Sequence, residues 1–310
     1  MEISFGLRNG EFKVCQFDKL MGLTEKRTFK FHDTNITSVE FSKDNSKMAL
    51  CSYDGCIEIY ETLHYNLLMS SFSKYDITLH KVIFSPFDDN KLICGGLHGY
   101  ISVFEIKNNL IKNNLIEISN NKISDYYITC LKFSPNKAFF AVISCLEPIK
   151  ILDPELFTEK FSLKCERRYD DLVFSLDSTK LITISESKKV DPGDNRIDIY
   201  ETVNFTIITS LTEDFYLNTI NFTKDDNKLV CGMRDGRIKF YSIGDNLTEI
   251  SMIDTLCDSV LNLKFSKDEK YFVITTSNGY IKIYSSDSLE LIYSSKESEE
   301  YIGTICLRDI

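Results

Sequence analysis

The chain has 310 residues, of which 43% are apolar and 26% are charged, a composition typical of a globular protein that buries a full core. Its formal net charge is −10. Because nucleic-acid binding depends on neutralising phosphates with Lys and Arg, this acidic balance argues against a nucleic-acid partner and favours protein partners with basic segments. The sequence contains no membrane-spanning apolar run and no signal segment, so we expect an intracellular protein, cytoplasmic or nuclear, without a membrane role.

The N-terminal residues predict three short strands. Ile3–Leu7, Phe12–Cys15 and Arg27–Phe31 are rich in apolar and aromatic residues, and the turn pair Asn9-Gly10 separates the first two. A phrase of the form apolar-x-x-apolar-x-Phe-Ser/Thr then begins and recurs along the chain. Its six copies are Ile36–Ser42, Leu79–Ser85, Ile128–Ser134, Tyr169–Ser175, Leu217–Thr223 and Val260–Ser266. The spacings between the Phe residues are 43, 49, 41, 48 and 43, a period that belongs to propeller blades or to helical repeats.

Within each repeat, alternation with period two indicates strands rather than helices. A polar turn follows the Phe, and next comes a short apolar run such as Lys47–Cys51. A tight Asp-Gly or Asn-Gly turn such as Asp54-Gly55 leads into an alternating strand such as Ile57–Tyr60. A weaker fourth strand, such as Leu67–Phe72, precedes the next copy. Four antiparallel strands per repeat predict the blade of a β-propeller.

The two ends of the chain supply one further blade. Ile302–Leu307 repeats the first-strand phrase, and the N-terminal strands fill the three places missing after it. The sequence therefore predicts an all-β, seven-bladed β-propeller of four-stranded antiparallel blades, with a ring closed by pairing of the N- and C-terminal segments. We expect one domain over residues 1–310. Its blades are expected at residues 33–76, 77–125, 126–166, 167–214, 215–257, 258–300, and 301–310 with 1–32.

Two insertions break the period. Lys107–Asn121 lengthens the second repeat and Ser185–Asn195 lengthens the fourth, and both are expected to project as surface loops. Such loops are often functional, but a surface loop also grows at little energetic cost. The sequence leaves both interpretations open.

The chain resembles the WD-repeat family over essentially its whole length, with degenerate repeats. Of the family's Gly-His before the first strand only His32 is kept, and Glu213 stands at the same place in a later repeat. The Trp of the family's Trp-Asp pair is replaced by Tyr in four repeats: Tyr60, Tyr200, Tyr241 and Tyr284. The Asp position holds an acidic residue in four repeats: Glu61, Glu105, Asp153 and Glu201. The resemblance implies a propeller that binds proteins, and it names no closer relative.

No motif for catalysis is present. The four histidines lie far from one another at unsuitable spacing for a metal, and there is no Cys-x-x-Cys, phosphate loop or nucleophile elbow. We therefore expect no catalytic residue, no metal, no cofactor and no small-molecule substrate.

The residues just before the first strands are the candidate binding surface, because in a propeller these strands line the central channel. Tyr and Arg, the residues enriched at binding hot spots, recur at this repeat position with acidic neighbours. These crown residues are Tyr127, Arg168, Phe215, Tyr216, Tyr301, Asp214 and Glu300. Aromatic rings beside carboxylates suit a peptide that carries Lys or Arg. Alternatively, the aromatic residues merely cover strand ends.

Two functions remain open. The first is a non-enzymatic scaffold or adaptor subunit of a larger intracellular complex, which the resemblance implies for most of the family. The second is a module that recognises a basic peptide, modified or not, on the channel-mouth face. A phosphoinositide-binding propeller is a more distant third. That family relies on Phe-Arg-Arg-Gly, whereas the residues flanking Arg167-Arg168 here differ from this motif.

Overall fold

The computed structural model describes residues 1–31, 33–74, 78–108, 113–163, 167–187, 194–223, 227–244 and 246–308. His32, at the family's His position, lies outside the described residues. By its internal contacts the chain divides into two compact units. Unit 1 is residues 1–131 with 302–310, and unit 2 is residues 132–301.

Unit 1 contains three four-stranded antiparallel blades. The terminal blade has the strand order β28-β1-β2-β3, and consists of β1 (Glu2–Leu7), β2 (Glu11–Asp18), β3 (Gly22–Lys30) and β28 (Ile302–Arg308). The next blade consists of β4 (Ile36–Phe41), β5 (Lys47–Ser52), β6 (Cys56–Glu61) and β7 (Leu67–Phe72). The third consists of β8 (Leu79–Phe84), β9 (Lys91–Gly96), β10 (Tyr100–Asn108) and β11 (Asn113–Lys122).

Four further blades follow, and the boundary between the units falls inside the first of their strands. The first consists of β12 (Ile128–Phe133), β13 (Phe140–Ser144), β14 (Ile149–Leu152) and β15 (Glu159–Leu163), and the second of β16 (Arg167–Phe174), β17 (Lys180–Ser187), β18 (Asn195–Glu201) and β19 (Ile207–Glu213). The third consists of β20 (Leu217–Phe222), β21 (Lys228–Met233), β22 (Arg237–Ile243) and β23 (Leu247–Asp254). The fourth consists of β24 (Val260–Phe265), β25 (Tyr271–Thr276), β26 (Tyr280–Ser285) and β27 (Leu291–Lys296).

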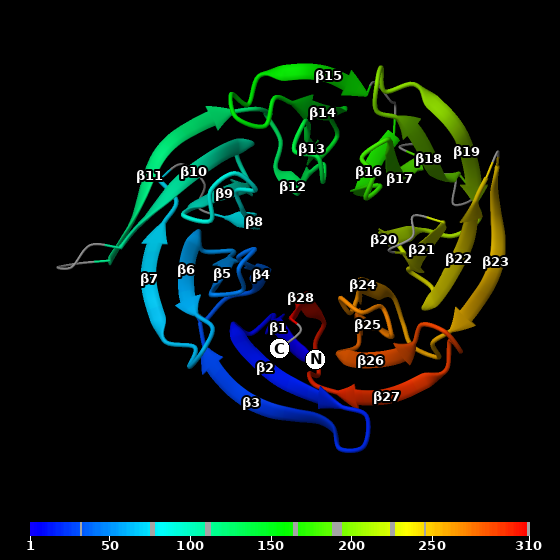
Figure 1. Ribbon diagram of the computed structural model, residues 1–310, viewed down its shortest axis with the longest axis horizontal. Coiled ribbons are helices and arrows are strands. Elements are labelled where there is room, and N and C mark those ends of the chain that lie inside the picture. Colours follow the sequence, from blue (N-terminus) through cyan, green and yellow to red (C-terminus); the bar gives the residue numbers. More distant parts are fainter. Residues whose placement is uncertain are drawn as a thin grey trace. The chain divides into compact units, whose positions relative to one another are not determined.

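The predicted fold class is confirmed: the protein is an all-β, seven-bladed β-propeller of four-stranded antiparallel blades. β28 pairs with β1, with Ile305 opposite Phe5 and Arg308 opposite Glu2, so the two ends of the chain share one blade and close the ring. Figure 1 shows β28, in red, beside β1, in blue. The pairing gives an inner strand to a blade that the N-terminal segment alone would leave incomplete.

The core consists of the alternating apolar residues that the sequence assigns to strands. The Tyr residues at the family's Trp position are buried, and Tyr241 is fully inaccessible to solvent. Tyr284 stacks on Phe272 with ring centres 5.1 Å apart and an interplanar angle of 8°. Burial of such large apolar surfaces is the main stabilising contribution.

The Ser that ends the first-strand phrase holds the turn after it. Ser42 donates from Oγ to the Asp44 carboxylate at 2.6 Å and accepts a hydrogen bond from the Lys47 amide at 2.9 Å. Ser175 and Ser266 repeat both contacts in their own blades. The pattern explains why the phrase ends in Ser or Thr, since the hydroxyl fixes the turn that joins the first two strands.

A different polar contact replaces the family's His in one repeat. Glu213 is buried, accepts a hydrogen bond from the Tyr241 hydroxyl at 2.7 Å and pairs with Lys239 Nζ at 2.6 Å. Glu213 stands at the His position and Tyr241 at the Trp position of the same repeat. Both substituted positions therefore contact each other, and each buried polar group has a partner.

The two predicted insertions differ from the expected loops. Lys107 and Asn108 extend β10, and residues 113–122 form β11, which pairs with β10 along its length. Most of the expected loop at Lys107–Asn121 is thus a lengthened hairpin, because pairing satisfies backbone groups that a loop would leave to solvent. In Ser185–Asn195, residues 185–187 end β17 and Asn195 begins β18, while residues 188–193 lie outside the described residues.

Candidate functional site

Arg168 and Tyr216, two crown residues, belong to one polar network in unit 2. Arg168, near the start of β16, pairs through Nη1 with the Glu186 carboxylate at 3.0 Å. Glu186, near the end of β17, also pairs with Arg234 Nη2 at 3.7 Å, and Arg234 follows β21 in the neighbouring blade. Arg234 donates from Nε to Asn218 Oδ1 at 3.1 Å and lies over the Tyr216 ring, 4.7 Å from its centre. We call Arg168, Glu186, Tyr216 and Arg234 the arginine cluster.

Both aromatic crown residues of this region already carry a cation on one face. The Arg237 guanidinium carbon lies 4.3 Å from the centre of the Phe215 ring, which is 46% exposed. Arg237 over Phe215 and Arg234 over Tyr216 thus each cover one face of a ring that the sequence predicts to contact a basic peptide. The rings are therefore suited to cations, and one face of each is already covered by an arginine of this chain.

Asp170 lies beneath the arginine cluster and is mostly buried. It occupies a β-bulge of β16, where the register shifts between Tyr169 and Asp171, and its carboxylate lies 3.7 Å from Arg168 Nη2. Burial, with the like charge of Glu186, raises the pKa of Asp170 from 3.8 to about 7, although Arg168 and Arg234 oppose the shift. Asp170 thus changes its charge near neutral pH, beside the arginine cluster.

The remaining crown residues have separate surroundings. Tyr127 belongs to unit 1, where its ring centre lies 5.4 Å from that of His80, which in turn lies 5.4 Å from that of Tyr53. Burial lowers the pKa of His80. In unit 2, Asp214 and Glu300 are exposed and Tyr301, directly before β28, is half-buried. Of the seven predicted residues, only Arg168 and Tyr216 are joined through the arginine cluster.

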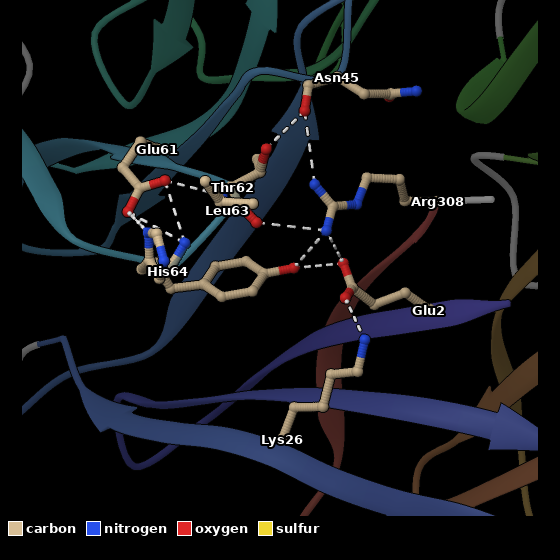
Figure 2. Close-up of polar contacts among 9 residues, drawn as sticks. Glu2, Lys26, Asn45, Glu61, Thr62, Leu63, His64 and Arg308 are labelled. Carbon is tan, nitrogen blue, oxygen red and sulfur yellow. Dashed lines mark hydrogen bonds and ion pairs between the residues drawn. The ribbon is translucent and has the colours of Figure 1, made fainter. Parts of the chain in front are cut away.

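A second polar site lies in unit 1, and sequence reasoning missed it. Glu2 is 1% exposed, and its carboxylate pairs with Arg308 Nη2 at 2.7 Å and with Lys26 Nζ at 3.3 Å (Figure 2). Tyr65 donates its hydroxyl hydrogen bond to the same carboxylate, and burial together with this bond raises the pKa of Tyr65. Arg308 occupies the Ser/Thr position of the repeat phrase, so the departure from that pattern is the signal that could have revealed the site.

These residues border a pocket of about 590 Å³. Its lining residues are Glu2, Lys26, Arg27, Asn45, Thr62, Leu63, His64, Tyr65 and Arg308, and we call it the terminal pocket. The Glu61 carboxylate accepts hydrogen bonds from the Leu63 and His64 amides and thereby fixes the turn that forms one wall (Figure 2). Glu61 stands at the family's Asp position, and Glu201 holds the corresponding turn in unit 2 in the same way.

The described part of the chain offers little for catalytic chemistry. Among the described residues no group of three or more His, Cys, Asp or Glu side chains could hold a metal ion. Burial raises the pKa of the Cys51 and Cys56 thiols to about 12, so these cysteines are protonated and unreactive at neutral pH. Within the described ranges no helix is long and apolar enough to cross a membrane.

Comparison with known proteins agrees with this architecture. A family model described as "WD domain, G-beta repeat" matches residues 23–61. The match runs from β3, the last strand of the terminal blade, through β4 and β5 to β6 of the next blade, so the sequence repeat is offset from the blade by one strand. This match and the seven four-stranded blades support a WD-repeat β-propeller. Propellers of this family are generally non-enzymatic scaffolds that bind protein partners.

A solved structure, described as that of the computationally designed Ika8 protein, is similar in fold. The TM-score is 0.69 and the sequence identity 17%, over 99% of this chain and 88% of that chain. At this identity the likeness concerns the fold alone. No match was found among the sequences of curated proteins.

Proposed function

We propose that this protein is a non-enzymatic adaptor subunit of a larger assembly and that one protein partner docks on the arginine cluster and the adjoining Phe215. The observation that carries the proposal is the pre-ordered pairing of Arg and aromatic side chains across two neighbouring blades. Arg168 and Arg234 are 43% and 41% exposed, yet both are held by Glu186. Side chains that are already ordered lose little conformational entropy on binding, and Tyr and Arg are the residues most often found at hot spots.

The test is the double variant Phe215→Ala with Tyr216→Ala. We expect at least tenfold weaker binding to the natural partner, because truncating a hot-spot aromatic residue costs about 2 kcal/mol or more. Partners captured from the native organism with the wild-type protein would be titrated against each variant. The matched control is Ile207→Ala with Ile208→Ala on β19, which removes exposed apolar surface elsewhere in unit 2. Equal binding by wild type and the Phe215, Tyr216 variant, with a loss in the Ile variant, contradicts the proposed surface.

Recognition of a basic peptide is the second candidate, and the arginines over Phe215 and Tyr216 provide a direct test of it. If a peptide cation takes the place of Arg234 and Arg237, removing both side chains frees the ring faces. The variant Arg234→Ala with Arg237→Ala would then bind a labelled Lys/Arg peptide more tightly than wild type, in a salt-sensitive way. Unchanged or weaker binding of that peptide counts against this candidate and leaves the adaptor proposal standing.

A further inference from the structure

The terminal pocket carries a positive side chain, Arg27, that the fold does not require. A groove at the same repeat position in unit 2, of about 380 Å³, provides the comparison. The two grooves share their backbone frame. Asn45 and Glu269, in corresponding turns, both have positive φ angles, of 58° and 54°, and Tyr65 and Leu289 both have φ of 59°. The grooves therefore differ in their side chains rather than in their construction.

At three corresponding positions the terminal pocket has a cation where the other groove has none. Lys26 and Arg27 correspond to Ile250 and Ser251, and Arg308 corresponds to Thr223. The charged residues that line the unit 2 groove are three acidic ones, Asp268, Glu269 and Asp287, and two lysines, Lys228 and Lys270. Lys26 and Arg308 neutralise the buried Glu2, whose place in the unit 2 groove is taken by Lys228. Arg27 has no such role, so structural need does not account for it.

A β-bulge explains how two consecutive residues both reach the terminal pocket. Side chains of neighbouring strand residues normally point to opposite faces of a sheet. In β3, however, Arg27 pairs with Val14 and Glu25 with Cys15, so Lys26 is the extra, unpaired residue. Such a bulge redirects the side chains around it, and Lys26 and Arg27 both line the pocket.

Arg27 is positioned but not neutralised. Its Nη2 donates a hydrogen bond to the His64 carbonyl at 3.0 Å, which fixes the guanidinium against the pocket wall. No carboxylate of the described residues pairs with it, and the side chain is exposed. Glu2, by contrast, is occupied by Arg308, Lys26 and Tyr65 (Figure 2). The pocket thus presents cationic groups in a protein whose net charge is −10.

We infer that the terminal pocket binds an acidic segment of a protein partner, with an Asp or Glu carboxylate on Arg27, beside Lys26. A guanidinium held in place donates two parallel hydrogen bonds to a carboxylate, which gives both strength and orientation. Leu63, 80% exposed at the pocket, offers apolar contact to a residue beside that carboxylate. This site goes beyond the proposed function, because it uses residues of unit 1 and a partner of opposite charge to the basic peptide considered for unit 2.

The test measures binding of a fluorescein-labelled peptide of alternating Glu and Leu residues by polarisation, with a Gln–Leu peptide for comparison. The variants are Arg27→Ala and Lys26→Ala with Arg27→Ala. The matched control, Lys228→Ala with Lys270→Ala, removes two positive charges from the unit 2 groove. We expect the double pocket variant to bind the Glu peptide at least tenfold more weakly than wild type, the control to stay within twofold of wild type, and the Gln peptide to bind at least tenfold more weakly than the Glu peptide.

Arg27→Ala leaves the contacts of Glu2 in place, so it keeps the test valid if the double variant unfolds. A loss of similar size in the control overturns the inference, since it would reflect net charge alone. No measurable binding of the Glu peptide to wild type overturns it as well. The inference is also overturned if an oligonucleotide of equal charge, or phosphatidylserine vesicles, bind more tightly than the Glu peptide and depend on Arg27. The pocket would then serve another class of ligand. The Phe215→Ala, Tyr216→Ala variant should bind the Glu peptide as wild type does, which separates this site from the proposed function.

Discussion

At the scale of single residues, Asp170 is a buried carboxyl group whose charged neighbours shift its pKa in opposite directions. Glu186 and burial favour its protonated form, while Arg168 and Arg234 favour the carboxylate. The folded protein retains the proton up to about pH 7, whereas the unfolded chain releases it near 3.8. Its contribution to stability is therefore fully present below pH 3.8 and is lost as the pH rises through 7.

The variant Asp170→Asn removes this titration. At pH 8 we expect it to increase the free energy of unfolding by on the order of 2 kcal/mol, because a neutral amide avoids the cost of burying a charged carboxylate. Thermal melts of wild type and variant between pH 5 and 8 would measure it. Asp214→Asn, which changes an exposed carboxylate, is the control and should leave the pH dependence as it is in wild type. A parallel pH dependence in wild type and Asp170→Asn contradicts the interpretation.

The elements of the terminal blade meet without a covalent turn between β28 and β1. In the blade of β4–β7, Ser42 and Lys47 flank the turn that joins the first two strands, and Arg308 and Glu2 occupy the same two positions in the terminal blade. An ion pair at 2.7 Å thus stands where other blades have a hydroxyl and a chain connection. Arg308 also donates to the Thr62 and Asn45 carbonyls of the neighbouring blade.

Breaking this ion pair should be costly. In Arg308→Met the Glu2 carboxylate loses its closest cation while remaining buried, and removal of one partner of a buried pair costs about 3 kcal/mol or more. Urea unfolding of Arg308→Met, Glu2→Gln and the double variant would give the coupling energy between the two residues. We expect the double variant to be more stable than the sum of the single effects predicts. Strict additivity would mean that the pair does not stabilise the blade.

The sequence allowed the elements to be predicted more reliably than the site. Each copy of the repeat phrase became a first strand because alternation and a following Ser-held turn act locally. The residues that cover the aromatic crown could not be found in this way. Arg234 and Arg237 flank the hairpin turn at Gly236, between β21 and β22, whereas Phe215 and Tyr216 directly precede β20. The pairing of β20, β21 and β22 brings the two arginines over the two rings.

At the scale of the whole molecule, closure depends on the last strand. β28 supplies the inner strand of the terminal blade, including the buried residues Ile302 and Ile305. Its loss would expose the edge of β1, a strand whose residues are all buried. That all 310 residues form one domain stays a prediction, since internal contacts divide the chain into two units.

Deletion of residues 301–310 should therefore be severely destabilising. We expect loss of the cooperative melting transition, or insoluble protein, because an inner strand and its buried apolar surface are removed together. Circular dichroism and thermal melting would measure the effect, and deletion of residues 309–310 alone is the control. A melting temperature equal to that of wild type in the long deletion would refute the role of β28 in closure.

The offset between sequence repeat and blade affects how the molecule can unfold. The repeat at residues 23–61 contributes its first strand, β3, to the terminal blade and the next three to the blade of β4–β7. In a linear repeat array, by contrast, an end repeat can fray because it touches only one neighbour and shares no sheet with it. Here, melting one repeat strips the outer strand from the adjoining sheet, so the two blades lose order together. The offset thus couples these blades into one cooperative folding unit and suppresses local opening.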